Sequence, residues 1–246
     1  MAQFRQMGLA GDYFLAFNLK VLPRRGESTT IPGRMWGARF SAGPVTRVAL
    51  VEPESATESE RYLAHNGENA QAWRLTEFSD EARSELLTAE TLLDPIAGTG
   101  LSMFELQMPF IYWSDFVYEG TTEVRGRAVH AFLMFPPEEF AATHPDIGGV
   151  RLHLDANFHA LMQAVVLDEL EEPVRKLTVL DLKKLGSQWI VKSIDVRDEQ
   201  TRDKVRFEVT GAALDLEFSP QLFSPESLAV TVEPPASVEP LRWWGL

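Results

Sequence analysis

Apolar and polar residues alternate with a period of two along much of the chain. Residues 150–155 and 204–210 alternate without a break, and shorter alternations occupy residues 17–21 and 214–218. Strands of this kind bury one face and leave the other in water, which is typical of antiparallel sheets. The positions that share the apolar face of the two longest alternations are Leu152, Leu154, Val205, Phe207 and Val209.

Further runs rich in β-branched and aromatic residues predict more strands, and Gly, Pro and Asn stand between them. These runs are residues 34–40, 45–51, 72–78, 124–135, 161–168, 174–185 and 189–197. The connections after residue 148 are short, and short links join antiparallel neighbours. The pattern therefore predicts ten or eleven strands in a meander that forms one large curved sheet or barrel.

Signals for helices are few and short. Acidic residues after Ser79 and the leucines that follow predict a helix that ends before Asp94-Pro95. The sequence Ser102-Met103-Phe104-Glu105 fits a capping box, which predicts a short helix that Pro109 stops. Ser-Pro pairs at residues 219–220 and 224–225 predict one-turn helices. The fold class expected is therefore mainly β, with a minor helical part.

The composition excludes several classes of function. The 246 residues carry a formal charge of −13, which argues against a nucleic-acid or anionic-membrane binder. Cys is absent, so disulfides and thiolate chemistry are excluded. No run approaches the length of a membrane-spanning helix, and residues 1–5 do not resemble a signal peptide. We expect a single domain over residues 1–246, with its core at about 10–230 and a Pro-rich tail at 231–246 extended over the surface.

The sequence lacks the familiar catalytic motifs. Gly98-Thr99-Gly100 is half of a dinucleotide fingerprint and reads better as a turn before a helix. His153, Asp155 and His159 could ligate a metal, but His153 and Asp155 also fit the polar face of a half-exposed strand. A hydrolase that uses His153 or His130 is a further alternative. We expect no catalysis, no metal and no cofactor.

Residues 106–118 concentrate aromatic side chains. One interpretation is core packing of a loop that crosses the sheet. The other is an aromatic lid over an apolar cavity, which is typical of sites for lipid-like ligands. On this second interpretation, the candidate ligand-binding residues of lid and cavity are Leu106, Phe110, Trp113, Leu152, Leu154, Val205, Phe207 and Val209.

Several stretches resemble a known family in their order and spacing. They are residues 102–115, 118–120, 124–130, 150–155, 185–192 and 218–223, with looser agreement at 34–37 and 44–48. In these stretches the chain resembles the LolA/LolB-like superfamily, and within it the proteins described as outer-membrane lipoprotein-sorting proteins.

This resemblance implies a strongly curved antiparallel sheet that forms an unclosed half-barrel, with short helices over its apolar concave face. It also implies a periplasmic protein of the cell envelope that carries acyl chains of lipoproteins or other lipids and exchanges them with an envelope transport-complex partner. The family's signal peptide or lipid-anchor Cys is absent from this sequence. The alternative is a non-catalytic structural or envelope-complex module of the same fold, with a filled cavity.

Overall fold

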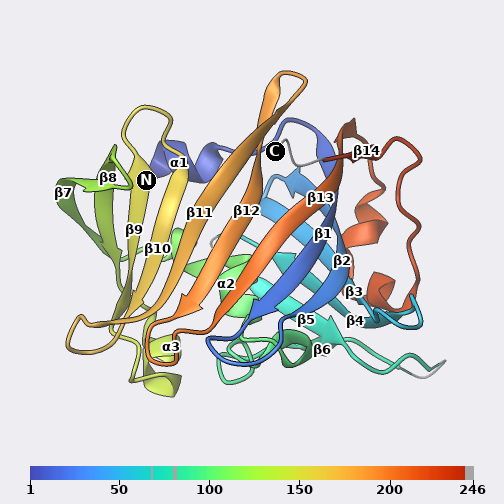
Figure 1. Ribbon diagram of the computed structural model, residues 1–246, viewed down its shortest axis with the longest axis horizontal. Coiled ribbons are helices and arrows are strands. Elements are labelled where there is room, and N and C mark those ends of the chain that lie inside the picture. Colours follow the sequence, from blue (N-terminus) through green and yellow to red (C-terminus); the bar gives the residue numbers. More distant parts are fainter. Residues whose placement is uncertain (68, 80–81, 242–246) are drawn as a thin grey trace.

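The computed structural model describes residues 1–67, 69–79 and 82–241, and one antiparallel sheet dominates it (Figure 1). Its strands in the described residues are β1 (Asp12–Leu22), β2 (Thr29–Phe40), β3 (Gly43–Val51), β4 (Glu58–His65), β5 (Gln71–Leu75), β6 (Glu85–Leu86), β7 (Phe116–Val124), β8 (Arg127–Met134), β9 (Gly149–Asp155), β10 (Leu161–Leu167), β11 (Pro173–Leu185), β12 (Gln188–Asp198), β13 (Lys204–Leu216) and β14 (Glu239–Pro240).

The sheet consists of two meanders that meet in the middle. Strands β1 to β6 form one meander and β7 to β13 the other, and the pairing of β1 with β13 joins them. Within the described residues the strand order starts at β6 and ends at β7, so the curved sheet stays open between these two edges. The predicted half-barrel is confirmed. It has fourteen strands in the described part of the chain instead of ten or eleven, and two of them, β6 and β14, are only two residues long.

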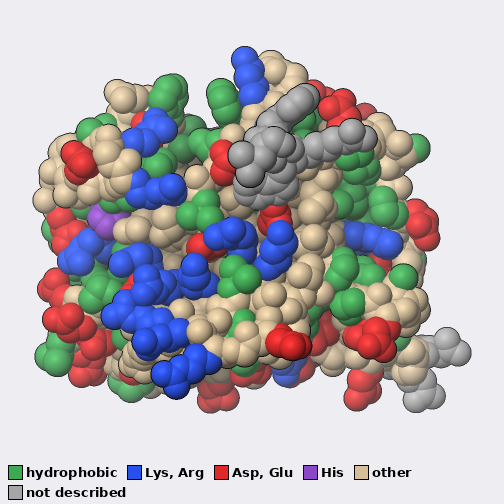
Figure 2. Space-filling model, viewed as in Figure 1, with side chains coloured by type: hydrophobic (Ala, Val, Ile, Leu, Met, Phe, Trp, Pro, Cys, Tyr) green, Lys and Arg blue, Asp and Glu red, His purple; other side chains and the backbone are tan. Residues whose placement is uncertain are grey.

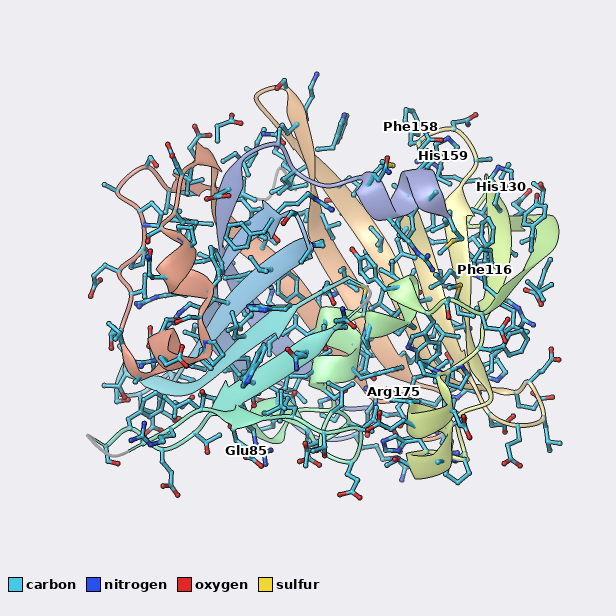
Figure 3. The ribbon with its side chains drawn as sticks, turned by 180° about the vertical axis from the view of Figure 1, so that it is seen from behind. Glu85, Phe116, His130, Phe158, His159 and Arg175 are labelled. Carbon is cyan, nitrogen blue, oxygen red and sulfur yellow. The ribbon has the colours of Figure 1, made fainter. Side chains whose placement is uncertain are left out.

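Short helices account for the remaining regular structure. They are α1 (Ala2–Gln6), η1 (Ile96–Gly98), α2 (Met103–Gln107), η2 (Pro109–Tyr112), α3 (Glu138–Thr143), η3 (Pro220–Phe223) and η4 (Pro225–Ala229). Residues 87–115, here called the cover, join edge strand β6 to edge strand β7 and contain η1, α2 and η2. Because these strands are the two edges of the sheet, the linking chain must cross from one to the other. It does so over the concave face, where α1 also lies, while α3 lies at one end of the strands (Figure 3).

The main hydrophobic core lies between the concave face and the cover. Val205 and Phe207 from β13 belong to the same buried cluster as Phe104 and Phe110 from the cover. Phe207 stacks on Phe17 of β1, with ring centroids 4.5 Å apart. Burial of large aromatic side chains is the dominant favourable contribution to such a core.

A second core on the opposite face of β1 to β5 corrects the expectation that the convex face meets water. Phe14 and Trp36 pack there against Phe223 and Leu228 from the C-terminal segment that contains η3 and η4. Two arginines, Arg47 and Arg61, fix this segment. Strands β2 to β4 are therefore buried on both faces over part of their length, which is why residues 48–51 are apolar on both faces instead of alternating.

Arg47 and Arg61 hold the C-terminal segment through carbonyl groups. Arg47, with no exposed surface, donates to the carbonyl oxygens of Ser227 and Val230 at 2.7 and 2.6 Å. Arg61 donates to the carbonyl oxygen of Leu228 at 2.7 Å. Burial and, to a smaller extent, the neighbouring charge of Arg61 lower the pKa of Arg47 to about 10. The guanidinium groups thus donate to carbonyls at the C-terminal end of η4, where the last carbonyls of a helix lack partners of their own; the Ser227 carbonyl also accepts the backbone N–H of Val230 at 2.9 Å.

The convex face of β9 to β13 carries Lys and Arg side chains (Figure 2). Register places Arg151, Lys176, Arg197 and Lys204 in one row across these strands. The acidic partners of the last three lie deeper: the side chains of Asp195 and Glu199 are both 13% exposed. This face therefore alternates as predicted, with its charged side in water.

Two helix predictions are confirmed and one is wrong. Ser102 caps α2, and both Ser-Pro pairs open one-turn helices. The helix expected after Ser79 is absent from residues 82–93, while residues 80–81 lie outside the described residues. There Leu86 pairs with Trp73 on β5, because the open edge of β5 offers backbone partners that a short solvent-exposed helix lacks. Likewise, Phe116 to Tyr118 begin β7 and are not part of a loop.

Candidate functional site

The cover is a compact segment with its own backbone scaffold. The backbone N–H of Ser102 donates to the Glu105 carboxylate at 2.9 Å, and this capping box starts α2. Met108 adopts a left-handed conformation, with φ of 53°, and Pro109 follows as the first residue of η2. This break turns the chain so that residues of both helices reach the concave face.

Four aromatic side chains of the concave side fill the space beneath the cover. The ring of Phe104 lies 5.2 Å from that of Phe110 and 5.3 Å from that of Phe140, between centroids. Trp113 lies 5.5 Å from Phe140. All four side chains are buried. The concave face is therefore occupied by the protein's own aromatic cluster.

Most of the sequence-predicted candidates come together at this place. Six of them belong to the one buried cluster between sheet and cover: Phe110, Trp113, Leu152, Val205, Phe207 and Val209. Leu106 is half-buried and packs against that cluster. Leu154 is buried, but it lines a separate cavity toward β7.

An ion pair ties the cover to the sheet. Arg175 Nε on β11 lies 2.5 Å from Glu105 Oε1 on α2, and the Glu105 side chain is only 3% exposed. Arg175 also donates through Nη2 to the carbonyl oxygen of Gly100. The same loop touches β13, since a Cβ at Gly100 would lie 3.6 Å from Val205 Cγ2. We call this group of contacts the latch.

Other polar contacts hold the cover at its rim. Gln107 Nε2 donates to the carbonyl oxygens of His65 and Gln71, both at 3.1 Å. At the far end, Arg5 of α1 donates to the carbonyl oxygens of Ile111 and Trp113, at 2.8 and 2.6 Å. Further polar contacts lie along the cover: the backbone N–H of Ala97 donates to Glu60 at 3.0 Å, and Arg74 pairs with Asp94 at 3.1 Å. The rest of the contact with the sheet is apolar, and apolar contacts are non-directional.

A cavity of about 160 Å³ opens on the concave side near the β7 edge. Its apolar lining comes from Met1 and Phe4 of the N-terminal segment, Phe132 of β8 and Leu154 of β9, and its polar lining from Gln3, His130 and His159. Phe116 and Tyr118 of β7 extend the aromatic wall, packing on Phe132 at 6.1 and 5.1 Å. We call this space the mouth cavity. A second cavity, of about 240 Å³, lies between the β11–β12 turn, β13 and residues Ser237 and Glu239.

The histidines considered as metal ligands do not converge. His153 is on β9, and burial lowers its pKa, as does the charge of Arg151. The Asp155 carboxylate accepts the backbone N–H groups of Asn157 and Phe158 and pairs with Arg127 at 2.8 Å. Asp155 thus builds the β9–β10 turn, and His159 lines the mouth cavity. Within the described ranges, no group of three or more His, Asp or Glu side chains is arranged to hold a metal ion.

Three aromatic residues of the site escaped sequence reasoning. Phe140 on α3, Phe132 on β8 and Phe4 on α1 each contact the concave side from a different element. The residues around them do not alternate between apolar and polar in a way that assigns these side chains to one face. The resemblance of residues 124–130 stops just before Phe132, so only the strand register could have placed it.

No protein-family model and no curated protein matches this sequence. Solved structures do match it in fold. A DUF1329 family protein from Desulfovibrio piger has a TM-score of 0.76 at 14% identity, and covers 92% of this chain and 95% of its own. A domain from Vibrio parahaemolyticus, provisionally described as an outer membrane lipoprotein-sorting protein domain, has a TM-score of 0.76 at 14% identity, with 92% and 94% covered. A LolA superfamily protein from Nitrosomonas europaea has a TM-score of 0.65 at 9% identity, with 89% and 92% covered.

These likenesses establish a shared fold, the open half-barrel of LolA-like proteins. At such low identity they leave the function of this chain to be argued from its own site. In the part of the chain that the structure describes, no helix is both long enough and apolar enough to cross a membrane.

Proposed function

We propose that this protein binds acyl chains of lipoproteins or other lipids in the periplasm and takes part in outer-membrane lipoprotein sorting. One observation carries the proposal: the apolar concave face of the sheet is covered by a single edge-to-edge segment instead of a second sheet. The fold shared with a domain described for lipoprotein sorting and with a LolA superfamily protein supports it. The proposal assigns no catalytic step to any residue.

On this proposal, the structure represents the closed state. An acyl chain enters when the cover moves outward. The chain then takes the place that the aromatic rings of Phe104, Phe110 and Trp113 occupy against the sheet. Each buried CH₂ group contributes about 0.8 kcal/mol, so a long chain supplies enough free energy to displace these contacts. A partner of the envelope transport complex would then remove the lipid, because a bound chain needs an acceptor of comparable affinity.

The second candidate function is a non-catalytic structural or envelope-complex module. The observation in its favour is that the concave face is filled by Phe104, Phe110, Trp113 and Phe140. The two cavities described above measure about 240 and 160 Å³, below the roughly 300 Å³ at which small-molecule sites begin. A module of this kind keeps its cover closed permanently.

A reversible disulfide between the cover and the sheet distinguishes the two functions by experiment. The chain has no Cys, so a variant with Gly100→Cys and Val205→Cys can form only one intramolecular disulfide. A Cβ at Gly100 would lie 3.6 Å from Val205 Cγ2, and a Cys Sγ at residue 205 can take the place of that atom, so the two sulfur atoms can approach each other. We expect the oxidised variant to lose binding of a fluorescent fatty acid and the reduced variant to regain it.

The single variants Gly100→Cys and Val205→Cys serve as controls, since neither can form the disulfide. Native mass spectrometry of mildly purified wild-type protein supplies the second readout, because a carrier retains lipid. Absence of both retained lipid and fatty-acid binding would favour the structural module. Equal binding by the oxidised and reduced double variant would show that ligand does not enter beneath the cover.

A further inference from the structure

We propose that the mouth cavity holds the anionic head of a single-chain lipid, with His130 and His159 donating hydrogen bonds to its carboxylate or phosphate oxygens. The inference rests on the proposed function and adds to it the class of ligand and the direction in which the lipid lies. Its acyl chain runs from the mouth cavity along β8 and β9 into the space beneath the cover.

The lining of the mouth cavity has the composition that an amphiphile requires. Phe4, Phe132 and Leu154 give it apolar walls, while His130 and His159 give it hydrogen-bonding groups. The two histidines come from β8 and from the β9–β10 turn, and both lie on the same side of the sheet as Phe116 (Figure 3). A site with apolar walls and a small number of placed polar groups is typical of ligand binding.

A hydrogen bond fixes the ring of His130. Its Nδ1 lies 3.0 Å from the Tyr118 hydroxyl and 3.5 Å from Thr121 Oγ1. When Tyr118 donates to Nδ1, the ring proton resides on Nε2, which is then a donor for a ligand. Tyr118 is 51% exposed, so burial alone does not explain its position against the imidazole.

The turn that carries His159 is held firmly in an unusual conformation. His159 has φ of 55°, a left-handed conformation that costs energy for a residue with a side chain. The carboxylate of Asp155 accepts two backbone N–H groups of this turn, and the backbone N–H of His159 donates to the Asp155 carbonyl at 2.8 Å. Strain that the surroundings maintain is frequent at ligand sites.

In the part of the chain that the structure describes, no Asp or Glu is among the residues that line the cavity, so no carboxylate there opposes an anion. Arg127 pairs with Asp155 and thereby compensates the carboxylate of the neighbouring turn. Arg5, from the same helix as Phe4, donates to carbonyl oxygens of the cover and lies 5.8 Å from the Phe116 ring. The proposal therefore assigns recognition of the anion to His130 and His159 alone.

Apolar residues continue from the cavity toward the interior in the required direction. Leu154 lies two residues from Leu152 on the same face of β9, and Leu152 belongs to the buried cluster beneath the cover. Phe132 pairs with Leu152 across β8 and β9 and packs against the same cluster. A volume of about 160 Å³ accommodates a head group and the first carbons, and the apolar path receives the rest.

The test compares a pyrene-labelled fatty acid with its methyl ester, which has the same chain and no charge. We expect wild type to bind the acid about tenfold more tightly, the effect of one or two hydrogen bonds to a charged group. The double variant His130→Phe, His159→Asn should bind acid and ester equally, with its affinity for the ester unchanged. Asn tolerates the left-handed conformation at position 159. His153→Gln, a histidine outside the cavity, is the matched control and should keep the preference for the acid.

Three results separate the two proposals. If wild type binds acid and ester equally, the head-group inference is wrong while acyl binding stands. If neither probe binds, the proposed function fails and the inference with it. If millimolar acetate or inorganic phosphate displaces the acid, the cavity is a site for a free anion, and the lipid assignment is wrong. Unchanged ester binding shows that the double variant is folded.

Discussion

The guanidinium of Arg175 on β11 and the carboxylate of Glu105 on α2 meet at 2.5 Å, across the boundary between the sheet and its cover. The carboxylate is nearly buried, while the Arg175 side chain is 27% exposed. Arg175 therefore reaches inward from the half-exposed rim to compensate a charge that the cover has buried. Because Gly100 of the cover also accepts from Arg175, one side chain holds two points of the segment that we expect to move.

Replacing Arg175 should loosen the cover selectively. Arg175→Gln leaves Glu105 without its cation and removes the charged donor of the Gly100 carbonyl, and a lost hydrogen bond to a charged group costs about 1.5–3 kcal/mol. We expect amide hydrogen exchange in residues 96–113 to accelerate at least tenfold, and fatty-acid association to become faster. Arg206→Gln is the matched control: it breaks an ion pair of 2.6 Å with Asp195 on the convex face, away from the cover. Equal exchange in residues 96–113 of both variants would contradict the role of the latch.

Gly33 on β2 provides the space for an aromatic ring of the concave face. It pairs with Phe17 on β1, and a Cβ at this position would lie 2.2 Å from Phe17 Cζ. Gly33→Ala should push the ring off its stacking contact with Phe207 and lower the free energy of unfolding by about 1–3 kcal/mol. Urea denaturation measures the change. Gly100→Ala is the control, because its Cβ makes only an ordinary contact with Val205, and it should change stability by less than about 0.5 kcal/mol.

Phe207 tests the assignment of the apolar face to ligand binding. Phe207→Ala should cost about 3–5 kcal/mol and Phe207→Asp a similar amount, since the latter buries an unpaired charge next to Phe17. Both variants should also lower the affinity for a fluorescent fatty acid. Leu170→Asp, at a side chain 81% exposed on the β10–β11 turn, should leave both quantities unchanged. A folded Phe207→Asp variant with normal binding would show that the ligand does not touch this face.

The sequence was informative wherever a local rule decides the structure. Alternation in residues 204–210 assigned Val205 and Phe207 to one face, because a strand with one wet side leaves a pattern of period two. The capping box of Ser102 and Glu105 could also be predicted from the sequence, since its two residues lie three positions apart. The open edges of the sheet, and hence the route of the cover, depend on pairing between β1 and β13, which are about 190 residues apart in sequence.

Features that depend on distant partners were missed for the same reason. The leucines after Ser79 satisfy a helical period, yet Leu86 pairs with β5, because tertiary context overrides a weak local preference. The burial of Arg47 had no local signal, since its acceptors lie 180 or more residues away in the C-terminal segment. The sequence indicates His130 only as an alternative catalytic residue, and its place in the mouth cavity follows from the register with β7.

His153 gives a prediction about pH. Burial lowers its pKa below the usual value of 6.5, the charge of Arg151 lowers it further, and Glu119 opposes this effect. Above pH 6.5 both the folded and the unfolded chain hold the imidazole neutral, so its contribution to stability is then fully present. Below pH 6.5 the unfolded chain binds a proton that the folded chain does not, so the free energy of unfolding falls as the pH falls toward the folded pKa.

The change has an upper limit of about 1.4 kcal/mol per pH unit, the value for one proton. His153→Gln removes the titrating group, so urea denaturation between pH 5 and pH 8 should show a shallower acid-side decline than in wild type. The free energy of unfolding of wild type minus that of the variant should therefore be larger at pH 8 than at pH 5. A difference that stays constant over this range would show that His153 takes up its proton equally well in the folded protein.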